Sequence, residues 1–346
     1  MKNNMAETLT RGGKPAETWK SPDGSTAVVL SHGGRILALL TPDSEHNLFW
    51  THPALESPAS LRAFYQDNAW HNSGGDRTWL SPETDFFLPQ YPDLDTYVQP
   101  QELDPGHYVL TRDRAGFTLT NRLSLIVSRT RTTVDLEISK RLLPAKNPLR
   151  HHAVLATIGY AGYTLTTKLS YVAGSESHAK ISIWSLLQLP PGGEFLIPTC
   201  SSPTISTYFG HIGEGIVKTS SHLTRCTFAE SGNYKVGFDP LTSIGRIGYL
   251  YSNGMDRCLI VRNFPVNPSG DYVDAPHTCL SAQGSAIEIC SVNGEFGRFS
   301  EIEYHTPAIG GAEGELSCED ESQLWAFRGT ERDVLDVART LISSEV

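Results

Sequence analysis

The stretch STAVVLSHGGRILALL, residues 25–40, shows the pattern that decides the fold. Two short apolar runs, Ser25 to Leu30 and Arg35 to Leu40, flank a turn at His32-Gly33-Gly34. Brief apolar runs separated by Gly, Pro or Asp are typical of β-hairpins. We therefore expect residues 25–40 to form two antiparallel strands.

The same pattern continues through most of the chain. In VDLEI, the apolar residues Val134, Leu136 and Ile138 alternate with acids, which places them on one face of a half-buried strand. Further runs of this kind cover residues 116–119, 122–128, 153–158, 163–169, 180–187, 194–197, 245–251, 258–263 and 286–291. The strongest predicted helix covers residues 330–343, where Thr330 can cap an apolar stripe. The sequence predicts an all-β fold of about 20 antiparallel strands in two packed sheets, with a C-terminal helix.

Length and charge narrow the function classes. The chain has 346 residues and a net charge of −10, which argues against a nucleic-acid binder because such proteins need a basic stripe. No apolar run is long enough to span a membrane, and the N-terminus lacks an apolar signal core, so we expect a cytoplasmic protein. We expect an N-terminal extension over residues 1–24 that can be partly disordered, followed by a single domain over residues 25–346. The oligomeric state is not predicted.

The cysteines do not form a recognisable metal motif. None is spaced as CxxC, so a zinc cluster is not expected. We interpret all six as buried, reduced thiols in strands. They are Cys200, Cys226, Cys258, Cys279, Cys290 and Cys318.

The densest polar segment is WHNSGGDRTWLSPE, residues 70–83. It places His71, Asp76, Arg77 and Glu83 close to Trp79 and to a pair of glycines. A sugar site needs an aromatic ring for the apolar face of the sugar and charged groups for its hydroxyls. The alternative is a structural turn with a buried ion pair between Asp76 and Arg77.

A second candidate is EIEYHTP, residues 301–307. On a strand, Glu301, Glu303 and His305 point to one face. Crowded carboxylates raise one another's pKa toward neutrality, which suits general acid/base catalysis. Two other interpretations stay open: an edge strand with its polar face in water, and a metal site built from the same three residues.

Weaker candidates lie elsewhere in the chain. His151 and His152 are adjacent, so at most one would enter a given site if they lie on a strand. Lys235 in YKVGF and Asp274 in DYVDAP are further polar candidates. The sequence contains no P-loop, GxSxG elbow, HExxH or GxGxxG motif, which disfavours nucleotide-dependent transfer and serine-hydrolase chemistry.

Several segments resemble the galactose mutarotase-like superfamily. GGDRTWLSPE resembles the motif GG-x-R-x-W-x-(A/S)-P-E of poorly characterised members of that superfamily. GGRILALLTPDSEHNLFW resembles their first hairpins, and ISIWSLLQLPPGGEFLIPT resembles their central tryptophan strand. YKVGF, EIEYHTPAI and LWAFRG then follow in the same order. The resemblance covers about residues 25–330 and implies a β-supersandwich with a concave carbohydrate-binding face.

The resemblance also implies roles for individual residues. In aldose 1-epimerases of that fold, a late glutamate takes the proton of the anomeric hydroxyl and a histidine protonates the ring oxygen. Here the base would be Glu303 or Glu301, and the acid would be His151 or His152, or else His71. The resemblance would make Arg77 a substrate binder, with Trp79 and Trp184 as stacking surfaces. The polar segments themselves add the substrate-binding candidates Asp76, Glu83, Lys235, Asp274 and His305.

The resemblance has limits that keep other functions open. The usual motif around the middle histidine is missing from RHHAVLATIGYAGY. Our first hypothesis is an aldose 1-epimerase-like enzyme that needs no cofactor or metal and acts on a mono- or oligosaccharide. The alternatives are a sugar-binding module without turnover, and a sugar lyase or metal-assisted isomerase that uses Glu301, Glu303 and His305.

Overall fold

The hairpin predicted over residues 25–40 forms β2 (Thr26–Leu30) and β3 (Arg35–Leu40) in the computed structural model. The turn between them places Gly33 and Gly34 at φ of 83° and 56°, where residues with a side chain are strained. A side chain at Gly34 would also meet the Tyr108 ring at 2.7 Å. The structure describes residues 5–153, 155–175, 178–229, 231–279, 283–312 and 314–346.

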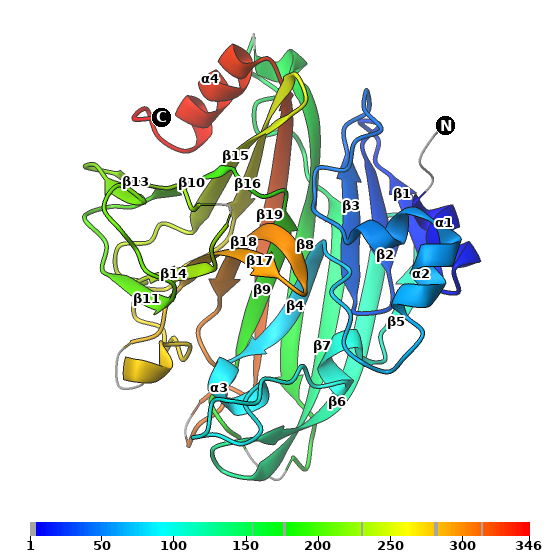
Figure 1. Cartoon of the computed structure of the whole chain (residues 1–346), viewed down its shortest axis with the longest axis vertical. Helices are drawn as coiled ribbons and strands as arrows, with labels where there is room; N and C mark the ends of the chain where they lie inside the picture. Colours follow the sequence, from blue (N-terminus) through cyan, green and yellow to red (C-terminus); the bar gives the residue numbers. More distant parts are fainter. Residues whose placement is uncertain (1–4, 154, 176–177, 230, 280–282, 313) are drawn as a thin grey trace.

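Two antiparallel sheets make up most of the structure (Figure 1). The nine-stranded sheet has the order β1 (Ala16–Lys20), β2, β3, β4 (Asp76–Ser81), β9 (Ser182–Leu189), β18 (Gly297–His305), β17 (Ile287–Gly294), β14 (Tyr234–Phe238) and β11 (Ile205–Phe209). The ten-stranded sheet has the order β12 (Val217–Thr219), β13 (Leu223–Cys226), β10 (Glu194–Pro198), β15 (Arg246–Asn253), β16 (Asp256–Asn263), β19 (Ser317–Gly329), β8 (Gly159–Tyr171), β7 (Thr132–Pro144), β6 (Phe117–Val127) and β5 (Val109–Arg112). The predicted all-β architecture is confirmed.

Four helices accompany the two sheets in the described part of the chain. They are α1 (Met5–Arg11), α2 (Pro58–Phe64), α3 (Glu83–Phe86) and α4 (Glu331–Leu341), with short turns η1 (Pro53–Glu56), η2 (Glu102–Gly106), η3 (Leu155–Thr157) and η4 (His277–Cys279). The predicted C-terminal helix is α4, and the Thr330 side chain accepts a hydrogen bond from Asp333 N at 3.2 Å. Val334, Val337 and Ala338 pack in one cluster with Leu259 and Phe327 of the ten-stranded sheet.

The main core fills the space between the two sheets. In β7, Val134, Leu136 and Ile138 are fully buried, as the alternation in VDLEI predicts. Asp135 and Glu137 between them are half-buried. Burying one face of each strand against the other sheet is what gives this sequence its period of two.

Three expectations need correction. Strands begin before residue 25, since β1 pairs with β2 and α1 buries Leu9 beside it. Residues 153–158 are not a strand: residues 155–157 form η3, and residue 154 lies outside the described residues. Cys200 is exposed and outside the strands, whereas Cys226, Cys258 and Cys290 are buried in β13, β16 and β17.

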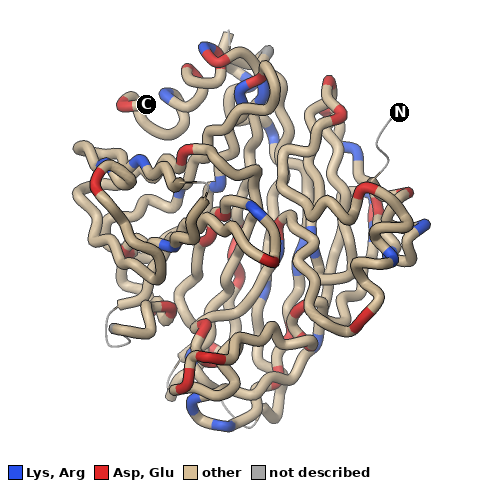
Figure 2. Tube along the Cα trace, viewed as in Figure 1, with Lys and Arg blue, Asp and Glu red and all other residues tan. Residues whose placement is uncertain are grey.

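Cys318 is half-buried in β19, and the side chain of Cys279 lies outside the described residues. Figure 2 shows Lys and Arg dispersed among Asp and Glu, without a continuous basic stripe in this view of the described chain. In the part of the chain that the structure describes, no helix has the length and apolar character needed to cross a membrane.

Candidate functional site

A pocket of about 280 Å3 lies on the face of the nine-stranded sheet that points away from the ten-stranded sheet. Most of its lining comes from β4, β9, β18, β17 and β14. These five strands are consecutive in the sheet (Figure 1). The lining residues are Trp70, Arg77, Trp79, Glu83, Tyr97, Gln99, Trp184, Leu186, Gln188, Phe209, Lys235, Cys290, Val292, Phe296, Phe299, Glu301 and Glu303. We call this space the sheet pocket.

The floor of the sheet pocket follows from the strand register. Paired residues on neighbouring strands point to the same side of a sheet, and every second residue along a strand returns to that side. One row is Lys235, Cys290, Glu301 and Gln188; the next is Glu288, Glu303, Leu186 and Arg77; the third is His305, Trp184 and Trp79. The register of β18 is continuous, so Glu301, Glu303 and His305 share one face of the strand.

Glu301 is held by an arginine. Arg77 Nη1 donates to Glu301 Oε1 at 2.8 Å, and both side chains are almost fully buried. The Arg77 guanidinium lies 4.3 Å from the centre of the Trp79 ring. Trp79 Nε1 in turn donates to Asp104 Oδ2 at 2.9 Å. This chain of contacts fixes the position of Glu301 in the pocket.

Glu303 lies in a different environment. Trp184 Nε1 donates to Glu303 Oε2 at 2.8 Å, and Lys235 Nζ lies 3.1 Å from the same oxygen. Lys235 Nζ is closer to Glu288 Oε2, at 2.7 Å, and lies 4.5 Å from the centre of the Trp184 ring. The Lys235 ammonium group therefore lies within ion-pair distance of two buried carboxyl groups.

This arrangement shifts three pKa values. Burial raises the pKa of Glu303 to about 8; Lys235 opposes the shift, and the charges of Glu301 and Glu288 add to it. Burial would lower the pKa of Lys235, but Glu288 and Glu303 outweigh it and raise this pKa well above its usual value. Burial would raise the pKa of Glu288, but Lys235 and His305 outweigh it and lower this pKa. At pH 7 the proton is therefore on Glu303, while Lys235 and Glu288 are charged.

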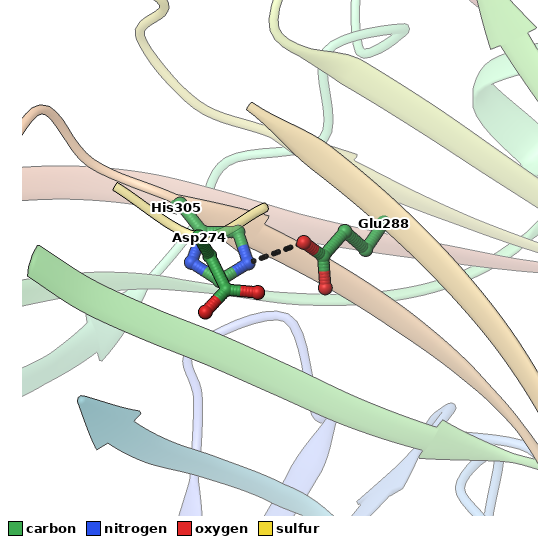
Figure 3. Close-up of side chains that lie close together, drawn as sticks. All are labelled: Asp274, Glu288 and His305. Carbon is green, nitrogen blue, oxygen red and sulfur yellow. Dashed lines mark ion pairs between the residues drawn. The ribbon is translucent and has the colours of Figure 1, made fainter. Parts of the chain in front are cut away.

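Beside the sheet pocket lies a cluster of Asp274, Glu288 and His305, drawn in Figure 3. His305 Nε2 is 3.2 Å from Glu288 Oε1, and its Nδ1 is 3.0 Å from Ser81 Oγ. Asp274 Oδ1 accepts from the backbone N of Glu83 at 2.7 Å. Burial, followed by the charge of Glu288, raises the pKa of Asp274 well above its usual value.

The structure does not assemble the predicted metal set of Glu301, Glu303 and His305. Glu301 and Glu303 group with Cys290, whereas His305 lies farther along β18, beside Trp184, and groups with Asp274 and Glu288. Two carboxylates and an imidazole are ligands for a transition metal. However, Lys235 Nζ already lies 2.7 Å from Glu288 and supplies a positive charge there.

Seven of the predicted site residues line the sheet pocket, and the others lie elsewhere. The seven are Glu301, Glu303, Arg77, Trp79, Glu83, Trp184 and Lys235. His305 and Asp274 lie beside the pocket lining, and the ring of His305 stacks on Trp184 at 5.6 Å between centres. Among the described residues that line the pocket, none is a histidine.

Three predicted site residues, Asp76, His152 and His71, lie outside the lining of the sheet pocket. Asp76 is fully buried and its Oδ2 pairs with Arg262 Nη2 of the other sheet at 2.5 Å, because residues 76 and 77 of a strand face opposite ways. The predicted alternative of an Asp76–Arg77 ion pair fails for the same reason. His152 is exposed in the loop after β7, where its Nδ1 accepts from Leu155 N at 3.1 Å. His71 lines a neighbouring hollow, with Nε2 3.0 Å from Asp67 Oδ1.

Several residues that line the pocket were not among the predicted site residues. Gln188 is fully buried, and both ends of its side-chain amide lack a hydrogen-bond partner among the described residues. Its alternation with Trp184 and Leu186 in β9 could have indicated that Gln188 shares their face of the strand. Tyr97 donates to Glu83 Oε1 at 2.6 Å. Together with Phe209 and Phe296 it forms a rim, each residue 40–43% exposed, that no periodicity indicates.

Comparison with known proteins supports the architecture. No protein-family profile matches the sequence, and no curated protein does. A solved galactose mutarotase-like protein from Lactobacillus casei matches with a TM-score of 0.51 and 10% identity, over 91% of this chain and 100% of that chain. A protein provisionally assigned as an aldose 1-epimerase from Escherichia coli matches with a TM-score of 0.52 and 10% identity, over 91% and 99%.

A further solved structure, a protein from Synechocystis, matches with a TM-score of 0.52 and 11% identity, over 92% of this chain and 96% of that chain. At such identities the likeness concerns the fold and does not extend to activity. The two antiparallel sheets and the C-terminal helix of this chain form a galactose mutarotase-like fold.

Proposed function

We propose that this protein binds the reducing end of a sugar in the sheet pocket and interconverts its anomers, as an aldose 1-epimerase-like enzyme. The observation that carries the proposal is a pair of buried carboxyl groups in one pocket that have different partners. Glu301 is paired with Arg77, and Glu303 keeps its proton to a pKa of about 8. Two carboxyl groups in different environments can take the roles of acid and base, and the raised pKa of Glu303 suits the acid.

The geometry suits the chemistry of an anomeric carbon. The hydroxyl that loses a proton and the ring oxygen that gains one are bonded to the same carbon. Glu301 and Glu303 each offer an oxygen within 4.8 Å of the other. One sugar can therefore contact both groups at once, which is the positioning that general acid/base catalysis needs.

The proposed reaction balances without a cofactor. Glu301 takes the proton of the anomeric hydroxyl, Glu303 gives its proton to the ring oxygen, and the bond from the anomeric carbon to the ring oxygen breaks. The resulting aldehyde turns about its bond to the next carbon. The ring oxygen then attacks the other face of the carbonyl, Glu303 recovers its proton, and Glu301 returns its own to the new hydroxyl.

Other pocket residues would bind and orient the sugar. The unpaired amide of Gln188 can donate to and accept from hydroxyl groups, and Arg77 Nε also lacks a partner within the described part of the chain. Phe209 and Phe296 offer apolar ring surface at the rim. The resemblance implies a histidine acid, but the pocket has none among its described residues, so we assign that role to Glu303.

Exchange between the α and β anomeric protons of free aldoses, measured by NMR, tests the proposal. We expect the wild type to accelerate exchange and Glu303→Gln to lower the acceleration by about 100- to 10,000-fold. The matched control is Glu137→Gln, because Glu137 lies on β7 of the other sheet and pairs with Arg122. Full activity in Glu303→Gln would overturn the role of Glu303, and sugar binding without exchange would identify a binding module.

A further inference from the structure

A second hollow lies beside the sheet pocket. Its volume is about 260 Å3, and its walls come from Lys14, the β2–β3 turn, residues 65–71 and residues 101–107. Three histidines, His32, His71 and His107, line it, together with Tyr65 and Gln101. We call it the second hollow, and the acid/base chemistry proposed above does not use it.

The second hollow and the sheet pocket share a wall. Trp70 lines both spaces. Trp79 of the sheet pocket donates from Nε1 to Oδ2 of Asp104, which lines the second hollow, at 2.9 Å. The chain after Tyr97 runs along both, since Gln99 lines the pocket and Gln101 lines the hollow. The second hollow and the sheet pocket are therefore adjacent, with Trp70 between them.

The chemistry of the second hollow suits hydroxyl groups. Asp104 is neutralised by Arg35, whose Nη2 lies 2.5 Å from its Oδ2, and His71 is paired with Asp67. Burial, followed by the charge of Lys14, lowers the pKa of His32 to about 4, so His32 is neutral at pH 7. The same lining contains Glu102, whose charge is opposite to that of Lys14. Without an excess of positive charge, a neutral sugar fits better than a phosphate group.

The shared wall also contains a buried hydrogen-bond donor that has no acceptor in the described part of the chain. The Nε1 atom of Trp70 is buried and has no acceptor among the residues described. A buried indole N–H usually finds a hydrogen-bond partner. Trp70 lies in ring contact with Trp79 at 5.8 Å and with Phe296 at 5.2 Å between centres, so the unpaired donor belongs to the aromatic wall of the sheet pocket.

We propose that the second hollow is a binding subsite for a further sugar unit, so that the substrate is an uncharged oligosaccharide of at least two units. Its reducing unit occupies the sheet pocket and the next unit occupies the second hollow; this orientation rests on the proposed function. Each space alone is slightly smaller than the roughly 300–1,000 Å3 of typical ligand pockets, whereas the two together fall inside that range.

The test blocks the second hollow. Ala69 lines it and is exposed, so Ala69→Trp adds a large side chain there without removing a contact of the existing one. The measurement is kcat/KM for anomeric exchange of maltose, cellobiose and lactose relative to glucose and galactose. We expect the wild type to prefer a disaccharide by about tenfold, and Ala69→Trp to abolish that preference. His71→Ala is a second variant, and we expect it to reduce the preference.

The control places the same bulk elsewhere. Ala156→Trp alters a separate hollow of about 770 Å3, which shares no lining residue with the second hollow or the sheet pocket. We expect it to keep the wild-type preference. Wild-type exchange without a disaccharide preference, or a preference unchanged in Ala69→Trp, would overturn the subsite and leave the exchange chemistry standing.

A second readout separates this inference from the proposed function. If the wild type accelerates exchange of no sugar, saturation-transfer NMR of the same sugars measures binding alone. If the wild type binds a disaccharide more tightly than a monosaccharide, and Ala69→Trp loses this difference, the subsite is supported even without exchange. Binding of mono- and disaccharides that is equal, or absent for both, would overturn it.

Discussion

Adjacent residues of β4 place two buried ion pairs on opposite faces of the nine-stranded sheet. Asp76 points between the sheets and meets Arg262 at 2.5 Å, and Arg77 points into the sheet pocket and meets Glu301 at 2.8 Å. Tyr163 also donates to Asp76, and Lys140 donates to the carbonyl oxygen of Gly34 at 2.8 Å nearby in the interior. Both pairs are almost fully buried, so burial alone does not separate them.

The two faces of the sheet differ in their balance of buried charges. Between the sheets, Asp76 has an arginine of its own, and the pKa of Arg262 is raised because Asp76 outweighs the effect of burial. On the pocket face, Glu83, Asp274, Glu288, Glu301 and Glu303 share the two cations Arg77 and Lys235. An excess of buried carboxyl groups must keep a proton, and the pKa of Glu303 is raised accordingly. We therefore interpret the inner pair as structural and propose that proton transfer takes place on the pocket face.

Breaking the inner pair should give the largest effect on stability. Arg262→Met leaves Asp76 buried without its partner, which should lower the free energy of unfolding by about 3–5 kcal/mol. Urea denaturation followed by circular dichroism measures this change. A loss below about 1 kcal/mol, the range of an exposed salt bridge, would contradict the structural role of the pair.

A smaller effect of opposite sign is expected on the pocket face. Gln188→Leu removes a buried amide that has no partner in the described chain, so the ligand-free protein should become more stable by about 1 kcal/mol. The same substitution should weaken sugar binding, because the amide no longer meets a hydroxyl group. Thermal unfolding and calorimetric titration check the two effects. A destabilised variant with unchanged sugar affinity would show that Gln188 is ordinary core.

The two faces also show what sequence patterns can and cannot predict. Alternation in β7 and β18 predicts which side chains share a face, because the period of a strand is local. The same rule, applied to Asp76 and Arg77, would have excluded their joint presence in one site. The contact of Lys235 with Glu288 and Glu303 depends on the strand order β14, β17, β18, which no local pattern contains. Tyr97 and Phe296 reach the rim from outside the strands, where periodicity is absent.

The pH profile of wild-type anomeric exchange tests the central claim most directly. After subtraction of the spontaneous reaction, kcat/KM would be measured across about pH 5 to 10, with Glu137→Gln as the control. In this account Glu303 must hold a proton in the free enzyme, and its folded-state pKa is raised to about 8. Activity should therefore be present below that pH and fall as the pH rises through about 8. Activity that rises through the same range would show that Glu303 acts as the base and would contradict the assignment.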